Sequence, residues 1–298
     1  MRLNKFLAKS GIASRRRSDE LIRMAMTTVN NEIILDPACG SGIQLAAYCA
    51  MIGKKGLGIE LDQRTGEAAN CNLRRVADHG FDGCLMSSEI IIGDGTKSID
   101  GLKVALLHLD PARPRNSRTH GIEEMQPSIE SIFATWKDSL VLTDKGPAIL
   151  LDLSPRLQAH QRKEVEQIAD NFWPGIPKTW VWTSRGGGRI DRLSLWLGQL
   201  AQDKPSRFVR IPPDLKQKPL IIDGESKEIA TVRKLPRKGE YVSIIDSGLV
   251  ESGLSHEFIS NVLPNQEITW SIIEGRRPQF HHDEQMEIID KSNLLNYL

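Results

Sequence analysis

The chain has 298 residues, of which 40% are hydrophobic and 26% are charged, and its formal net charge at pH 7 is +1. This composition is ordinary for a globular protein, and no apolar run approaches the ~20 residues that cross a membrane. The four cysteines form no C-x-x-C pair, so the sequence predicts neither a zinc site nor a disulfide scaffold. The charged N-terminus lacks a following apolar segment, so we predict no secretory signal. We expect a cytoplasmic protein with no metal centre and no membrane partner.

The first 31 residues are basic and have a helical pattern. Leu3, Phe6 and Leu7 form one apolar helical face, and Ser14 can cap a second helix. Three arginines stand at the start of that second helix: Arg15, Arg16 and Arg17. Such a cluster can contact an RNA backbone, and the alternative is a solvated helix face.

Several stretches of this segment resemble the S-four-type RNA-binding domain that opens many RNA pseudouridine synthases. They are residues 1–7 (MRLNKFL), 11–16 (GIASRR), 19–22 (DELI) and 29–31 (VNN). In that family a hairpin completes the domain, whereas here the chain runs directly into the next apolar strand. The segment is therefore either a truncated domain of this type or a helical cover for the ligand site that follows. No pseudouridine-synthase catalytic motif is present after it.

From residue 32 to residue 200, apolar runs alternate with longer amphipathic stretches. The candidate strands are residues 32–36, 56–60, 89–92, 104–109, 148–152, 179–183 and 193–197. The candidate helices are residues 42–51, 64–79, 122–140 and 155–172. This alternation predicts an α/β fold, with a parallel sheet covered by helices on both faces. The last two strands have no helix between them, so we expect a terminal antiparallel hairpin joined through residues 184–189.

A Gly-rich turn follows the first of these strands. Residues 33–42 (IILDPACGSG) run from the strand into a helix, and Asp36 stands at the strand's end. Gly40 and Gly42 lack a Cβ, so the backbone there can turn tightly and come close to a ligand. The pattern is neither the dinucleotide motif G-x-G-x-x-G nor a phosphate-binding loop. It suits a nucleoside or amino-acid cofactor bound at the start of the helix.

Acidic residues also stand at the ends of the next three strands. Glu60 ends the second strand, where a carboxylate can accept both ribose hydroxyls. Asp94 follows the third strand and could read an adenine edge, and Asp110 follows the fourth and borders the substrate. Each alone could be an ordinary strand-end or turn residue, but their succession indicates one site. The candidate cofactor-binding residues are Asp36, Ala38, Gly40, Gly42, Glu60, Leu61, Asp94, Gly95 and Asp110.

These motifs resemble those of class I S-adenosylmethionine-dependent methyltransferases over roughly residues 32–200. The matching residues are Asp36, Gly40 and Gly42 in the first motif, Glu60, Asp94, and the pair Asp110 and Pro111 in the fourth motif. Residues 68–72 (AANCN) resemble the A-x-x-N segment common among RNA methyltransferases. The resemblance implies a Rossmann-like sheet with S-adenosyl-L-methionine as the cofactor.

Later segments resemble the methyltransferases that carry a THUMP-like C-terminal domain. They are residues 110–113 (DPAR), 127–128 (PS), 182–184 (WTS) and 195–198 (LWLG). Residues 202–213 are polar and contain prolines, so we predict a linker there. The resemblance implies that residues 206–298 form the THUMP-like module. Short β-like runs at 220–222, 241–245 and 267–273 and an amphipathic segment at 256–262 indicate a small α+β fold.

The residues after the fourth strand bear on the methyl acceptor. Enzymes that methylate base amines usually place an aromatic ring in this motif to stack the base, whereas Pro111 is followed by Ala112 and Arg113. No cysteine follows the fourth to sixth strands, which disfavours a covalent route. Direct displacement remains, with Asp110 and Pro111 as the catalytic candidates and Asp110 orienting the acceptor or taking its proton. Three arginines in this loop suit phosphate or carboxylate binding, or form a solvated loop: Arg113, Arg115 and Arg118.

Histidines are weaker candidates for function. His108 lies in an apolar strand, and we expect a core histidine with satisfied hydrogen bonds. His281 and His282, beside Asp283 and Glu284, could bind a metal, but a polar tail is the simpler interpretation.

We therefore predict an S-adenosylmethionine-dependent methyltransferase that acts on RNA, either rRNA or tRNA, by direct methyl transfer. The alternatives are a non-catalytic RNA-binding or assembly protein that keeps the fold, or a methyltransferase for a protein or a small molecule.

Overall fold

The computed structural model describes residues 32–78, 82–113, 121–186, 188–214, 217–263, 268–271 and 279–283. The chain divides into two compact units. The first consists of residues up to 178 together with 194–201, and the second of residues 179–193 together with the chain from 202 onward. The basic N-terminal segment with Arg15, Arg16 and Arg17 lies outside the described residues.

The first unit is built on a parallel sheet. Its strands are β1 (Ile33–Asp36), β2 (Gly56–Glu60), β3 (Glu89–Ile92), β4 (Val104–Leu109) and β6 (Gly146–Leu153). They lie in the order β3-β2-β1-β4-β6, with β8 (Arg192–Gly198) next to β6, and the short β5 (Leu142–Thr143) pairs antiparallel with β6. Leu35 aligns with Leu57 on one side and with Leu107 on the other. β1 and β4 are buried along their whole length, as strands covered on both faces must be.

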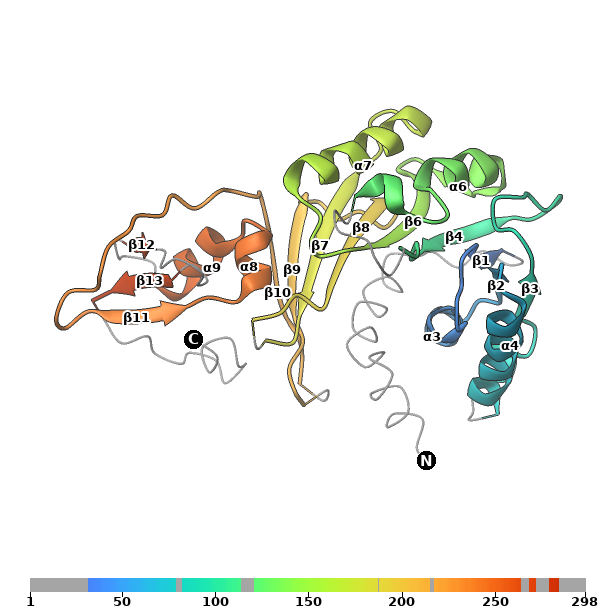
Figure 1. Cartoon of the computed structure of the whole chain (residues 1–298), viewed down its shortest axis with the longest axis horizontal. Coiled ribbons are helices and arrows are strands. Elements are labelled where there is room, and N and C mark those ends of the chain that lie inside the picture. The colour runs from blue at the N-terminus through green and yellow to red at the C-terminus, as the bar shows by residue number, and fades with distance from the viewer. Residues whose placement is uncertain are drawn as a thin grey trace. The chain divides into compact units, whose positions relative to one another are not determined.

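Helices cover both faces of this sheet (Figure 1). One face carries α3 (Ile43–Ile52) and α4 (Gln63–Ala77), and the other carries α6 (Ile129–Trp136) and α7 (Ala159–Phe172). The short helical turns are α5 (Asp82–Leu85), η1 (Ile122–Glu124) and η2 (Lys137–Ser139). The predicted α/β class with a parallel sheet is confirmed, and the strand predictions agree with the structure to within two residues.

The predicted helix over residues 122–140 is wrong, because the chain there forms η1, α6 and η2 in succession. Pro127 has no N–H to continue a helix, and the Ser128 side chain caps α6 by accepting a hydrogen bond from the Ser131 N–H. The helix predicted from residue 155 begins later, at Ala159, where Gln158 and Gln161 form a capping box.

The order of the strands creates a switch point. β2 and β3 extend from one side of β1, whereas β4 and β6 extend from the other. In parallel sheets a ligand binds outside the carboxyl ends of the strands where the order reverses. Here that point lies between β1 and β4, which places Asp36 and Asp110 at the same edge.

The predicted hairpin after the parallel strands is confirmed. In the loop that follows β7 (Lys178–Ser184), the Asp191 N–H donates to the Thr183 carbonyl over 2.8 Å. The Gly198 N–H donates to the Pro177 carbonyl over 2.9 Å. Because the paired residue numbers rise on one side as they fall on the other, the two segments run antiparallel.

The linker predicted over residues 202–213 is wrong, because it contains the buried strand β9 (Ser206–Arg210). β9 pairs in parallel with β7 and antiparallel with β10 (Leu220–Gly224). Its polar residues are compensated by ion pairs: Arg207 binds Asp223, and Arg210 binds Asp246. The polar sequence of residues 202–213 predicted an exposed linker, but its arginines are buried and paired with acids.

A small α+β module follows in the second unit, as predicted. Strands β11 (Tyr241–Ile244), β13 (Gln279–His282) and β12 (Thr269–Ser271) form an antiparallel sheet in that order. Helices α8 (Ser247–Glu251) and α9 (Ser255–Val262) lie between β11 and β12 in the chain.

The polar tail predicted for His281 and His282 is wrong, because both lie buried in β13. His281 Nε2 lies 2.9 Å from the Ser271 hydroxyl, and His282 Nε2 lies 2.9 Å from the Ser243 hydroxyl. Among the described residues, no three or more His, Cys, Asp or Glu side chains are grouped to hold a metal ion. No helix in the described part of the chain combines the length and the apolar character needed to cross a membrane.

Candidate functional site

The turn after β1 depends on two glycines that play different roles. Gly40 and Gly42 have φ values of +52° and +66°, a left-handed conformation that strains other residues. A Cβ at Gly42 would lie 3.0 Å from the Cβ of Ala69, so Gly42 allows close packing of the turn against α4. A Cβ at Gly40 would meet no atom of the described residues within 4 Å. The turn therefore has open space above Gly40 that a ligand could fill.

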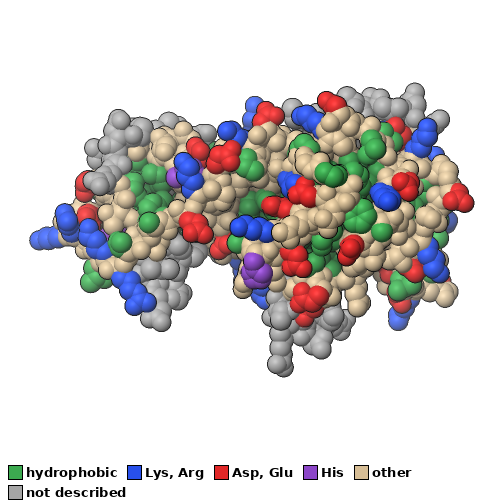
Figure 2. Space-filling view, turned by 90° about the horizontal axis from the view of Figure 1, so that it is seen from above, with side chains coloured by type: hydrophobic (Ala, Val, Ile, Leu, Met, Phe, Trp, Pro, Cys, Tyr) green, Lys and Arg blue, Asp and Glu red, His purple; other side chains and the backbone are tan. Residues whose placement is uncertain are grey.

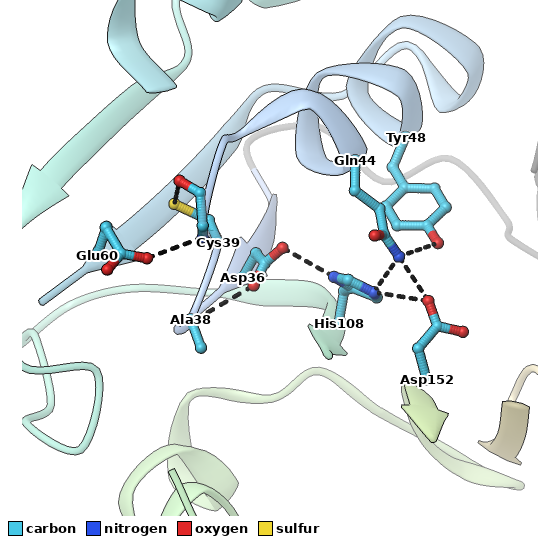
Figure 3. A network of polar contacts seen from close by, with 9 residues as sticks. Asp36, Ala38, Cys39, Gln44, Tyr48, Glu60, His108 and Asp152 are labelled. Atoms are coloured by element: carbon cyan, nitrogen blue, oxygen red, sulfur yellow. Dashed lines mark hydrogen bonds and ion pairs between the residues drawn. The ribbon is translucent and has the colours of Figure 1, made fainter. Parts of the chain in front are cut away.

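The Glu60 carboxylate lies beside this open part of the turn (Figure 3). Its Oε2 accepts a hydrogen bond from the Gly40 N–H over 2.9 Å, and its Oε1 accepts one from the Asp62 N–H over 3.0 Å. Asp62 in turn caps α4 by accepting from the Thr65 N–H over 2.8 Å. Each Glu60 oxygen has more than one lone pair, so the carboxylate can also accept hydroxyl protons from a ligand.

Asp36 approaches the turn from the buried side. Its Oδ1 accepts from the Ala38 N–H over 3.3 Å, and its Oδ2 lies 2.8 Å from Nδ1 of His108. The residue is 1% exposed. Asp36 thus shapes the turn from beneath, whereas Glu60 lines its open side.

His108 belongs to a buried polar network that joins β1, β4, β6 and α3 (Figure 3). Its Nε2 lies 3.2 Å from Oδ2 of Asp152, and that oxygen accepts from Gln44 Nε2 over 2.5 Å. Gln44 Nε2 also donates to the Tyr48 hydroxyl over 3.1 Å. The predicted core histidine is confirmed, since His108 is fully buried with a carboxylate at each nitrogen.

The charge of His108 follows from these partners. Burial would lower its pKa, but the negative charge of Asp36, followed by the hydrogen bonds and charge of Asp152, outweighs burial and raises the pKa to about 10. The two carboxylates thus favour the protonated form of His108.

Sequence reasoning missed Asp152 and Gln44. Asp152 ends the apolar run of a predicted strand, a position where a buried acid needs a partner. The sequence thus indicated that Asp152 needs a partner, but it did not indicate which residue that partner is.

The end of β3 packs directly against the turn after β1. A Cβ at Gly95 would lie 1.8 Å from the Pro37 carbonyl oxygen, so only glycine fits there. The Gly95 carbonyl accepts from the Trp136 indole N–H over 2.8 Å. Asp94 accepts from the Thr96 hydroxyl over 2.6 Å and from the Thr96 N–H over 2.9 Å, and these bonds lower the pKa of Asp94. The structure thus brings Asp94 and Gly95 to the same edge as Asp36, as predicted.

The segment after β4 carries the acceptor-side candidates. Asp110 is exposed and Pro111 is buried, and Ala112 exchanges two backbone hydrogen bonds of 2.9 Å with Gln126. Arg113 Nε and Nη2 are buried and have no hydrogen-bond partner in the part of the chain that the structure describes. Burial lowers the pKa of Arg113, while the charges of Asp110 and Glu124 oppose that shift. The other two arginines of this loop, Arg115 and Arg118, lie outside the described residues.

Two further side chains border the turn. Leu61, next to Glu60, is 76% exposed, which leaves its side chain available to a ligand ring. Cys39 is buried within the turn, and burial, with the charges of Asp36 and Glu60, raises the pKa of its thiol. Cys39 therefore stays protonated and is not a nucleophile.

No family model matches this chain, and no curated protein matches it in sequence. Among solved structures it is similar to a protein from Listeria monocytogenes described as a class I S-adenosylmethionine-dependent methyltransferase, with 13% identity and a TM-score of 0.43. That match covers 72% of this chain and 64% of the Listeria protein, which is less than two thirds of its length.

An rRNA methylase from Streptococcus thermophilus is 15% identical, with a TM-score of 0.39 and coverage of 62% of this chain and 95% of that one. A methyltransferase from Thiobacillus denitrificans in complex with S-adenosyl-L-homocysteine is 21% identical, with a TM-score of 0.34 and coverage of 51% and 57%. The function of this chain therefore has to be argued from its own residues.

Proposed function

We propose that this protein is an S-adenosylmethionine-dependent methyltransferase that acts on RNA by direct methyl transfer. The observation that carries the proposal is the position of the Glu60 carboxylate. It is held against the Gly40 N–H at the end of β2, beside space that no described residue fills, and β2 neighbours β1 at the switch point of the sheet. An acid that lines a Gly-rich turn at this point suits the ribose of a nucleoside cofactor.

The residues around the turn fit the parts of such a cofactor. Glu60 would accept the ribose hydroxyl protons, and exposed Leu61 offers apolar surface to the base. Asp94 would accept from the amino group on the edge of adenine, next to Gly95. The turn that Asp36 supports from beneath would hold the amino-acid part, and its N–H groups suit a carboxylate. When bound, the cofactor supplies a methyl group on a positively charged sulfur.

Asp110 is the residue we assign to the acceptor. It is exposed at the carboxyl end of β4, across the switch point from β1. The bound cofactor would supply the methyl group for direct displacement by a lone pair of the acceptor, with the carbon–sulfur electron pair left on sulfur. Asp110 would orient the acceptor and take the proton that it releases. Pro111, buried beside it, would fix the direction of the Asp110 backbone.

RNA is the substrate class that we favour because of Arg113. Its Nε and Nη2 have no acceptor among the described residues, and a phosphate would supply one. Acidic and basic side chains are intermingled on the face seen in Figure 2, so attraction for RNA there has to come from local groups of arginines. We propose that Arg113, Arg115 and Arg118 contact RNA beside the site, and that Arg15, Arg16 and Arg17 contact its backbone elsewhere.

The test is transfer of a labelled methyl group from S-adenosylmethionine into total RNA and, separately, into total protein extract. We expect label in RNA, and digestion to nucleosides would then identify the modified base. Label in protein alone would contradict RNA as the substrate. Calorimetry with S-adenosylmethionine tests cofactor binding independently of methyl transfer. A non-catalytic RNA-binding protein would transfer label to neither extract.

A further inference from the structure

The buried network beneath the turn has a direct route to the proposed cofactor site. Asp36 uses one carboxylate oxygen for the Ala38 N–H, at 3.3 Å, and the other for Nδ1 of His108, at 2.8 Å. Ala38 lies within the turn. Any rotation of the Asp36 carboxylate therefore changes the hydrogen bond that the Ala38 N–H of the turn donates.

His108 is held in one orientation from its far side. Its Nε2 lies 3.2 Å from Asp152 Oδ2, and Asp152 is fixed by Gln44 Nε2 at 2.5 Å and by the Ser194 hydroxyl at 2.6 Å. The Tyr48 ring packs 4.9 Å from the His108 ring. The imidazole is thus constrained at both nitrogens and on one face.

Nδ1 faces only the Asp36 carboxylate, and a carboxylate can only accept, so Nδ1 carries a proton and donates it to Asp36. Nε2 lies 3.2 Å from Asp152 Oδ2 and 2.8 Å from Gln44 Nε2, so two side chains hold the far side of the ring. Removing the Nδ1–H donor leaves a buried carboxylate short of a partner, which is costly. Asp36 also accepts a hydrogen bond from the Ala38 N–H. If the carboxylate rotates or binds water instead, the backbone of the Gly-rich turn would shift with it.

We propose that His108 is a positioning residue for the Gly-rich turn. Its Nδ1–H fixes the Asp36 carboxylate, which in turn fixes the N–H of Ala38, while Asp152 and Gln44 hold the ring in place. The consequence for S-adenosylmethionine affinity rests on the proposed function, but the effect on the turn itself does not. Small displacements of binding groups are expensive, because a shift of about 1 Å can cost ~100-fold.

Two matched variants separate this role from general stability. In His108→Asn the side-chain nitrogen takes the place of Nδ1, whereas in His108→Gln it takes the place of Nε2. Each variant keeps one of the two nitrogens, loses the other and has a neutral side chain. We expect His108→Gln to bind S-adenosylmethionine and S-adenosylhomocysteine about tenfold more weakly than His108→Asn does by calorimetry, with melting temperatures within a few degrees of each other.

Hydrogen exchange of the Ala38 amide provides a readout that needs no cofactor. We expect this amide to exchange about tenfold faster in His108→Gln than in His108→Asn. Equal exchange and equal affinity in the two variants would overturn the proposal, as would losses that simply follow the melting temperature. Val165→Ala, a core change on α7, is the stability control, and should lower the melting temperature without changing Ala38 exchange.

If the histidine variants do not fold, Asp36→Asn decides the question. An amide there lacks the second acceptor, so Ala38 exchange should rise about tenfold, and unchanged exchange would refute the mechanism. If the wild-type protein binds neither S-adenosylmethionine nor S-adenosylhomocysteine, the cofactor assignment is wrong. The Ala38 exchange measurements would still test the role of His108.

Discussion

The carboxylate of Glu60 and the backbone N–H of Gly40 are joined by a hydrogen bond of 2.9 Å, which ties the ends of β2 and β1 together. The same carboxylate accepts from the Asp62 N–H, so both of its oxygens already serve the backbone. This arrangement gives the acid a fixed direction before any ligand arrives. Fixed polar groups lower the cost of binding because less freedom is lost on association.

Glu60→Gln should weaken the binding of S-adenosylmethionine by about tenfold to a hundredfold. The amide has one acceptor oxygen instead of two, so a backbone N–H or a ribose hydroxyl loses its charged partner, worth roughly 1.5–3 kcal/mol. Calorimetry measures the dissociation constant. Glu67→Gln on α4 is the control, since Glu67 is exposed and bonded to Gln63, and an equal loss in both variants would count against the ribose role.

Two glycine substitutions should differ in stability for a geometric reason. Gly40→Ala strains a left-handed residue, at about 1–2 kcal/mol, but its Cβ would contact none of the residues that the structure describes. Gly95→Ala places a Cβ 1.8 Å from the Pro37 oxygen, so the backbone must move, at about 3 kcal/mol or more. Urea unfolding measures both free energies. Gly40→Ala should also impair cofactor binding, because its methyl group enters the open space of the turn, and binding like that of the wild type would argue that no ligand lies there.

Asp110→Asn should slow methyl transfer by ~100-fold or more while the protein still binds its cofactor. General-base assistance contributes about 10²–10⁴-fold, and an amide does not take a proton at neutral pH. Single-turnover transfer to RNA measures the rate, and calorimetry measures cofactor binding. Asp138→Asn, in η2, serves as the control. A normal rate in Asp110→Asn would remove this residue from the chemistry.

The stabilising effect of the His108 charge should depend on pH in a defined direction. The folded-state pKa of about 10 lies above the ordinary value of 6.5, so the proton is bound more tightly in the folded protein. The resulting stability is fully present below pH 6.5 and declines as the pH rises toward 10. The difference in unfolding free energy between the wild type and His108→Gln should therefore be largest at pH 6 and shrink by pH 9.5. A difference that grows with pH would contradict a buried imidazolium.

The second unit offers a contrast between a buried and an exposed ion pair. Asp246 binds buried Arg210 at 2.5 Å, and also accepts from the Ser184 hydroxyl and the Gly248 N–H, each at 2.8 Å. Asp246→Asn leaves a buried cation poorly compensated and should cost about 3–5 kcal/mol. Asp191→Asn removes the partner of the largely exposed Arg185 and should cost less than about 1 kcal/mol. Denaturant unfolding measures the free energy of unfolding of both variants. Similar losses would mean that burial does not determine how much an ion pair stabilises the protein.

The parallel sheet could be predicted from the sequence because its strands are short apolar runs with acids at their ends. β1, β2 and β4 follow that rule directly, and the positions of Glu60 and Asp110 come with it. Gly40 and Gly42 together indicated a tight turn that comes close to a ligand, whereas the structure assigns the open side to Gly40. These are local patterns that need no knowledge of distant residues.

What could not be predicted depends on contacts between distant segments. Asp152 looks like any strand-end acid until β6 is known to lie beside β4, which brings it to His108. Arg207 and Arg210 read as surface residues because their partners, Asp223 and Asp246, follow later in the chain. The helix expected over residues 122–140 is interrupted for a local reason, because Pro127 has no N–H to donate and Ser128 caps a new helix.

The buried strand β9 has a practical consequence for work with fragments of this protein. A fragment that ends near residue 200, at the predicted end of the sheet, would lack residues 206–210 and leave one edge of β7 without its hydrogen-bond partner. An uncovered strand edge pairs readily with other chains, so such a fragment should aggregate. The shortest fragment that keeps β7 and β9 covered extends through β10 to Gly224.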